Sequence, residues 1–344
     1  MTNINEYKNN HYVPVFFQKP WAIKGKSMAS SWAFKDGRII KPKASGTSIR
    51  SIASENWAHL LDDNLNLEES LYKEVDNRGA FLVSKIRSNP NSLIEMSRDE
   101  LESLFELISS IKSRCPSNIM RHEMASLDPD TDFGSFLNSQ DPDFKEDYLS
   151  RSENGKNTKG GALYAAIGVN LGRYLHGLYI TIRTVSSESL VLSDNPAQSL
   201  LETHVSLIPL SPNQALIISK SIQGLLHYSY MHEKSFVKLS NLSTMKFCSV
   251  VHEPNQCVSS FIEKYIGWGL RLSEQESDLF IKSVEEESNK APYVHDEFSI
   301  IGPDSQQTIS NKILEFELMN KERFGRSSQR NIIRKLNVSS MYFK

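Results

Sequence analysis

The chain has 344 residues, of which 39% are hydrophobic and 23% charged, and its formal net charge is −2. This length suffices for one large domain or two ordinary ones with a well-filled core, and the near-neutral charge excludes a general attraction to nucleic acid or to membranes. The cysteines Cys115, Cys248 and Cys257 are too few and too scattered for a disulfide framework. Without a signal-peptide pattern or a run of about 18 apolar residues, we expect a cytoplasmic protein that does not enter membranes.

The N-terminal part favours strands. Residues 11–17 (His-Tyr-Val-Pro-Val-Phe-Phe) are rich in β-branched and aromatic types, which is typical of a strand, and Pro14 indicates a sheet edge or a bulge. Asp36-Gly37 stands between two apolar runs and predicts a hairpin, because glycine adopts positive φ without strain.

The next part, from Glu55 to about Pro116, has helical spacing. A first helix has apolar residues through Ile86, and Ser97-Arg-Asp-Glu100 is a capping box that predicts the start of a second helix. The apolar stripe of the second helix is expected to face the core; it consists of Leu101, Leu104, Phe105, Ile108 and Ile111.

The remaining pattern alternates between polar stretches, strands and helices. Residues 126–161 are dominated by Asp, Ser, Asn, Gly and Lys, which predicts a long flexible loop. Short strands are expected at 177–185, 189–192, 204–208 and 215–218, and helices at 239–249 and 258–270. Helices followed by clustered strands predict an α+β fold, in which an antiparallel sheet of N-terminal and central strands carries a packed helical segment.

Three residues are candidates for catalysis. His11 can act as acid, base or metal ligand, or it can simply hydrogen-bond a loop. Asp194 ends an apolar strand within Ser193-Asp-Asn-Pro196, where it can serve as general base, metal ligand or orienter of a histidine, or can form a plain Asx-turn. Glu74 lies four residues before Arg78 on the first helix, so it forms an ordinary ion pair or supplies a second carboxylate.

The candidates for substrate binding lie beside these residues. Tyr12 follows His11 and points to the opposite face of the predicted strand. Asn195 neighbours Asp194, Ser211 belongs to a predicted turn at 209–212, and Asn241 stands where a helix is expected to start, a position at which it can also act as a cap. A divalent metal is an open alternative at this site, since His and carboxylates are metal ligands.

The ordered set of His11-Tyr-Val-Pro14, an acidic two-helix segment, Ser193-Asp-Asn-Pro196, the 209–212 turn and Asn241 resembles a bacterial family of unknown function marked by an N-terminal His-Tyr-Val-Pro motif. The resemblance covers residues 9–255, although Val15-Phe-Phe17 departs from the Phe-Tyr-Leu that typically follows the motif. It implies that His11, Asp194, Asn195 and Asn241 belong to one shared feature, and it supplies no reaction.

The C-terminal part is expected to be a separate addition. Residues 256–344 are predicted to form a helical extension, first acidic and then basic. The basic tail can contact nucleic-acid phosphates, or can be a solvated helix. Its cationic residues are Lys321, Arg323, Arg326, Arg330, Arg334, Lys335 and Lys344.

Three functions are compatible with these residues. The leading hypothesis is a hydrolytic enzyme acting on nucleic acid or a nucleotide, such as a toxin-like or phage-defence effector, because phosphodiester cleavage needs a proton acceptor and charge stabilisation. The second is a nucleotide-using transferase of the ADP-ribosyl type, with His11, Tyr12 and Glu74 as its side chains. The third is a non-enzymatic binding or sensor module, in which His11 and the turn at Asp194 only hold the fold together.

Overall fold

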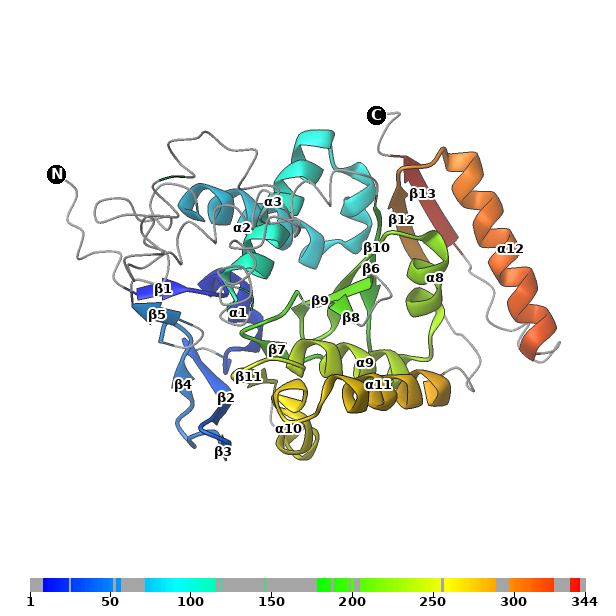
Figure 1. Cartoon of the computed structure of the whole chain (residues 1–344). Coiled ribbons are helices and arrows are strands. Elements are labelled where there is room, and N and C mark those ends of the chain that lie inside the picture. Colours follow the sequence, from blue (N-terminus) through cyan, green and yellow to red (C-terminus); the bar gives the residue numbers. More distant parts are fainter. Residues whose placement is uncertain are drawn as a thin grey trace.

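The computed structural model describes residues 9–24, 26–51, 54–56, 72–115, 118, 146, 178–186, 189–197, 199–200, 205–254, 257–288, 297–324 and 335–340. The loop expected at 126–161 lies outside these residues, apart from residue 146. The described parts form an α+β fold, as the sequence predicts (Figure 1).

A six-stranded sheet forms the centre, in the order β13-β12-β6-β10-β9-β8. Its strand pairs are antiparallel except for β12 and β13, which run parallel. The strands are β6 (Tyr179–Thr184), β8 (Ser199–Leu200), β9 (Val205–Ser211), β10 (Gln214–Ser219), β12 (Glu297–Gly302) and β13 (Lys335–Ser340).

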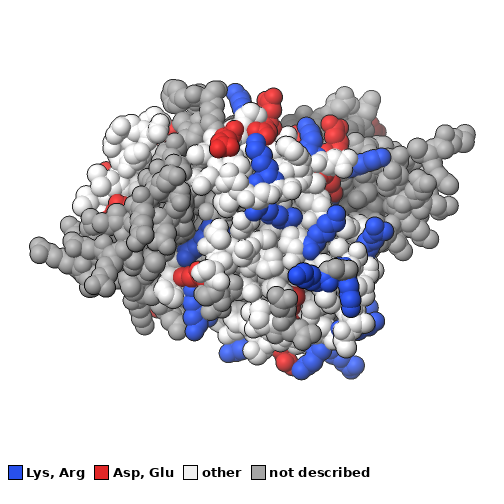
Figure 2. Space-filling view, turned by 180° about the vertical axis from the view of Figure 1, so that it is seen from behind, with Lys and Arg blue, Asp and Glu red and all other residues white. Residues whose placement is uncertain are grey.

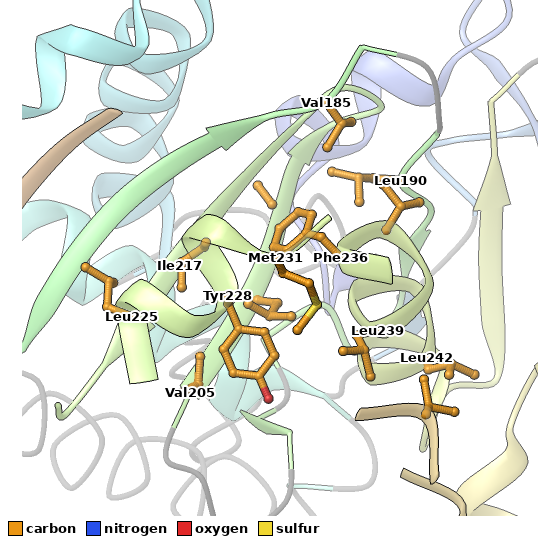
Figure 3. Close-up of a cluster of buried hydrophobic side chains, with 14 of the residues drawn as sticks. Val185, Leu190, Val205, Ile217, Leu225, Tyr228, Met231, Phe236, Leu239 and Leu242 are labelled. Atoms are coloured by element: carbon orange, nitrogen blue, oxygen red, sulfur yellow. The ribbon is translucent and has the colours of Figure 1, made fainter. Parts of the chain in front are cut away.

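Helices cover both faces of this sheet, which explains the continuous apolar run of β10. Side chains alternate along a strand, so Ala215 and Ile217 join one buried cluster whereas Leu216 and Ile218 join the other. The first cluster is completed by α8 (Ile222–Tyr230), α9 (Glu233–Met245), α11 (Glu274–Ser288) and α12 (Gln306–Phe324). Figure 3 shows part of it, with Met231 and Phe236 of the α8–α9 region beside Ile217.

The opposite face packs on α2 (Lys73–Ser88), the 3₁₀ segment Pro90–Glu95 and α3 (Arg98–Arg114). The predicted capping box is confirmed, because Ser97 and Glu100 exchange side-chain and backbone hydrogen bonds. All five predicted stripe residues of α3 are buried. A Cβ on Gly79 would lie 2.7 Å from Leu107 Cδ2, so this glycine permits the close approach of α2 and α3.

The expected helix start at Glu55 was wrong, because Ser54–Asn56 is strand β5. This strand pairs antiparallel with β1 (Asn9–His11) in a small separate sheet. Residues 57–71, which carry the first apolar positions of the predicted helix, lie outside the described residues.

The N-terminal strands form a second antiparallel sheet with order β3-β2-β11-β7. As expected, they share this sheet with a central strand, because β7 lies at the end of the strand predicted at 189–192, whereas the other central strands belong to the six-stranded sheet. The predicted hairpin is confirmed: Asp36 and Gly37 have φ of 50° and 73° between β2 and β3. The strands are β2 (Met28–Lys35), β3 (Arg38–Ile40), β4 (Thr47–Ser48, paired with β2), β7 (Leu192–Ser193) and β11 (Val250–Glu253).

The C-terminal part differs from the expected helical extension. Helices α10 (Ser259–Tyr265), α11 and α12 are present, with the 3₁₀ turn Trp268–Leu270 after α10, but β12 pairs with the central strand β6. Tyr179 on β6 also donates to Asp304, which accepts a 2.6 Å bond from Lys312 of α12. Residues beyond 256 therefore complete the central sheet and its helical cover.

No helix in the described part of the chain combines the length and the apolar run that crossing a lipid bilayer requires.

Candidate functional site

The His-Tyr-Val-Pro segment is not one continuous strand. It ends as a strand at His11, and the carbonyl of Pro14 accepts the 2.9 Å bond from Phe17 N that opens the short helix α1 (Val15–Gln18). The predicted strand over 11–17 was wrong because proline, with φ of −54° and no N–H, begins a helical turn here. Tyr12 is buried in the core, and half-buried His11 lies with Nε2 2.9 Å from the carbonyl oxygen of Arg50.

Asp194 is buried and connects the end of β7 to the start of β11 through hydrogen bonds. Its carboxylate accepts bonds of 3.0 and 3.2 Å from the backbone N–H of Ser249, just before β11, and its own N–H donates to Val250 O. Burial raises its pKa to about 7, against the opposing effect of these N–H donors. Asn195 is also fully buried, and its backbone N–H donates to Ser193 Oγ. His11 and Asp194 are thus held by different segments, and their shared catalytic site stays a prediction.

Asn241 and Ser211 have structural partners. Asn241 lies inside α9, not at a helix start, and its amide accepts from Val191 N (2.9 Å) and donates to Ser189 O (3.0 Å). Ser211 ends β9, and its Oγ donates to Asn213 Oδ1 in the β9–β10 turn at 2.6 Å. Both side chains thus have structural contacts, and their predicted roles in substrate binding stay predictions.

We expect Asn241→Ala to lower the free energy of unfolding by about 2–3 kcal/mol, because a buried N–H and a carbonyl would lose their partners. Urea denaturation followed by circular dichroism measures the change. Asn311→Ala, at an exposed position on α12, is the control and should change stability by less than about 0.5 kcal/mol. Equal effects of the two substitutions would contradict the structural role.

Glu74 does not face a buried site. Its side chain is 75% exposed and 3.9 Å from Arg78, a loose surface ion pair. The inward-facing carboxylate of α2 is Asp76, which lies two residues further along the helix. It accepts bonds of 2.6 and 3.0 Å from Arg114, whose side chain is 0% exposed. The prediction of Glu74 as second catalytic carboxylate therefore loses its structural basis.

A hydrogen-bonded chain of polar side chains centres on the buried His252 of β11, a residue that is not among the candidates from the sequence. His252 Nε2 lies 3.0 Å from Gln18 Oε1, and its Nδ1 lies 2.9 Å from Ser31 Oγ. Because Gln18 donates its amide N–H to Val13 O, its Oε1 is the acceptor, which places the histidine proton on Nε2. Burial lowers the pKa of His252 to about 4, so this histidine is neutral near pH 7.

A cavity of about 320 Å³ lies beside this chain. Its walls come from segments distant in sequence: the 3₁₀ turn Lys19–Trp21 (η2) and the loop after it, β2, the β9–β10 turn and the end of β11. The lining residues are Pro20, Trp21, Ala22, Ile23, Ser30, Pro212, Glu253 and Pro254. The cavity thus has mainly apolar walls with one hydroxyl and one carboxylate, which is the usual composition of a small-ligand site.

Near the cavity, residues 19–50 carry eight Lys and Arg residues against one acid, Asp36. All eight are exposed. Figure 2 shows cationic side chains gathered toward the lower right, where β2, β3 and β4 lie when the view of Figure 1 is turned by 180°. We call this set the basic surface: Lys19, Lys24, Lys26, Lys35, Arg38, Lys41, Lys43 and Arg50.

The basic surface was missed by the sequence reasoning, although local charge counting would have found it. The cavity has no such signal, because Trp21 and Glu253 are far apart in the sequence and only the β2–β11 pairing brings their segments together. Within the described parts of the chain, no group of three or more His, Cys, Asp or Glu side chains is arranged to hold a metal ion.

The model of a family described as proteins of unknown function (DUF4238) matches residues 9–254. The match covers well over half of the chain, so the chain belongs to this family. No curated protein and no solved structure matches the chain.

Proposed function

We propose that this member of the DUF4238 family binds nucleic acid through the basic surface of the β2–β4 layer. The observation that carries the proposal is the concentration of eight exposed cations against one acid in residues 19–50, within a chain of formal net charge −2. Phosphate contacts by Lys and Arg supply most of the affinity in non-specific nucleic-acid binding. A local cationic patch can thus attract nucleic-acid phosphates although the net charge of the whole chain does not.

The arrangement of the cations supports a polymeric anion. Lys35 and Arg38 are cross-strand partners at one end of the β2–β3 hairpin, whereas Lys24 and Lys26 precede the other end of β2. The eight residues of β2 span roughly 25 Å at strand geometry. A chain of phosphates can contact cations at both ends, whereas a single small anion cannot.

The contacts of the predicted catalytic and substrate-binding residues support binding over catalysis. Asp194 and Asn241 bond backbone groups of neighbouring segments, and Glu74 projects into solvent. Hydrolysis and ADP-ribosyl transfer stay predictions. Among the basic-tail residues, Arg326, Arg330, Arg334 and Lys344 lie outside the described residues, and we keep the tail as a proposed additional contact.

The test is fluorescence anisotropy of a labelled single-stranded oligonucleotide over a range of salt concentrations. We expect a variant with four charge reversals to bind the oligonucleotide about 100-fold or more weakly at low salt. Its substitutions are Lys24→Glu, Lys26→Glu, Lys35→Glu and Arg38→Glu. Removing four phosphate contacts should also flatten the slope of log K against log salt by roughly 3.

The control carries charge reversals away from the basic surface, at Lys220 and Lys282, which are both exposed. Lys220→Glu/Lys282→Glu is compared with the double variant Lys24→Glu/Lys26→Glu, which has the same change in net charge. Equal binding by these two double variants would contradict the proposal. So would tight binding to anionic phospholipid vesicles without binding to oligonucleotides.

A further inference from the structure

The Glu253 carboxylate in the cavity is a buried acceptor without a countercharge. Glu253 is 1% exposed. Its Oε2 accepts from Trp32 Nε1 at 2.7 Å, and its Oε1 accepts from Val258 N at 3.0 Å and Ser259 Oγ at 2.6 Å. These donors are all neutral, and no Lys, Arg or His in the described residues forms an ion pair with Glu253. Three of about four lone-pair positions are used, which leaves one acceptor position on Oε2.

Ser30 provides a second acceptor at the same place. It is the cross-strand partner of Glu253 in the β2–β11 pairing, and both residues line the cavity. Ser30 is 6% exposed, and its Oγ has no hydrogen-bond partner among the residues that the structure describes. A buried hydroxyl usually finds a partner, so a hydroxyl left unpaired on a cavity wall points to a ligand that supplies one.

We propose that the cavity receives one base of the bound strand, with guanine preferred; this inference rests on the proposed nucleic-acid binding. Guanine presents two adjacent donors, N1–H and the N2 amino group, which match the acceptors Glu253 Oε2 and Ser30 Oγ. Cytosine and adenine present one amino donor beside an acceptor, and uracil presents one N–H between two carbonyls. Proteins read unstacked bases in this way, by hydrogen bonds to the Watson–Crick edge.

The cavity and its rim suit a base attached to phosphates. Trp21, Pro212 and Pro254 give apolar walls for a flat ring, and about 320 Å³ lies at the small end of ligand pockets. Lys19 precedes Pro20 and Lys24 follows Ile23, so cations flank the lining segment. Lys26 N donates to Ile23 O at 2.9 Å, which holds the following turn against this segment. The cations on this rim attract phosphates. They also repel a free organic cation, which the Glu253 carboxylate would otherwise bind.

The experiment compares oligouridines that carry one central guanosine, inosine or uridine. We expect the wild type to bind the guanosine strand about 10-fold or more tightly than the uridine strand, as for a two-donor base contact. The affinity for the inosine strand, whose base lacks the N2 amino group, should lie between the affinities for the other two strands. Ser30→Ala should reduce the guanosine preference by about 5-fold with an unchanged salt slope, since one hydrogen bond is lost.

Ser27→Ala is the matched control, because Ser27 is exposed, directly precedes the strand β2 that carries Ser30, and does not line the cavity. Glu253→Gln is the second variant, with its thermal unfolding measured first, and it should remove the preference. Equal binding of all three strands by the wild type would overturn the inference while leaving the proposed function intact. Saturable binding of tryptamine without a base preference would overturn it in favour of a cationic ligand. Absence of binding to any strand would overturn the proposed function itself.

Discussion

Replacing Asp76 by Ala is expected to lower the free energy of unfolding by about 3–5 kcal/mol, because the buried guanidinium of Arg114 would lose the carboxylate that pairs with it. The Arg114 side chain is 0% exposed, and Asp76 accepts from both of its terminal nitrogens. Its Nε donates to Ser110 at 2.7 Å, and its guanidinium lies 3.8 Å from the ring centroid of Tyr72. None of these contacts replaces the lost negative charge.

Glu74 supplies the matched control, since it lies on the same helix two residues earlier and is 75% exposed. Glu74→Ala should change stability by less than about 0.5 kcal/mol, as for a surface ion pair. Chemical denaturation of both variants measures the difference. A loss of less than 1 kcal/mol for Asp76→Ala, or a larger loss for Glu74→Ala, would show that α2 and α3 are not held together in this way.

The second expected result is a pair of opposite pH dependences. The pKa of His252 is lowered to about 4 by burial, from about 6.5 in an unfolded chain. Between these values the unfolded state binds a proton that the native state does not, so the stability contribution is present above pH 6.5 and is lost as pH falls through 4. The difference corresponds to about 3 kcal/mol at 1.4 kcal/mol per pKa unit.

The pKa of Asp194 makes stability change with pH in the opposite direction. Burial raises its pKa to about 7, from 3.8. Between these values the native state holds a proton that the unfolded state has released, so the contribution is present below pH 3.8 and is lost as pH rises through 7. Its size is about 4 kcal/mol on the same conversion. In the wild type the two dependences therefore largely cancel between pH 4 and 6.5.

Substituting either residue isolates the pH dependence that the other one contributes. With His252→Asn, stability should fall as pH rises from 4 to 7, because only the Asp194 dependence remains. With Asp194→Asn, stability should rise with pH from 4 to 6.5. Urea denaturation at several pH values measures these slopes, and each slope is independent of the constant stability loss that either substitution causes. Parallel pH profiles for the wild type and both variants would contradict the assignment.

Local signals predicted part of this fold well. Asp36-Gly37 formed the expected hairpin, and Ser97 with Glu100 formed the expected capping box, because both motifs involve only neighbouring backbone groups. The strand predicted at 11–17 was wrong, because the local residue types there are compatible with more than one backbone conformation. A run of β-branched and aromatic residues suggests extended backbone, but a bend at Tyr12 and Val13 followed by the helical turn that holds Phe17 buries the same side chains.

The candidate site depended far more on contacts between distant segments. The sequence singles out Asp194 at the end of a strand and Asn241 at an expected helix start. Both are buried and hydrogen-bonded, but their partners are backbone groups about fifty residues away. Residue type alone cannot distinguish a carboxylate or an amide that holds two segments together from one that contacts a substrate.

Four features follow from the sequence alone: the α+β class, the Asp36-Gly37 turn with the Ser97 cap, the apolar stripe of α3, and the cationic character of residues 19–50. These follow from side-chain periodicity and from charge, which act over a few residues. Contacts between distant segments were needed to show that residues beyond 256 complete the central sheet, that Asp76 and not Glu74 faces inward, and that Ser30 meets Glu253 at a cavity. Each of these depends on strand pairing or helix packing between segments far apart in the chain, whose register is set by the burial of whole faces.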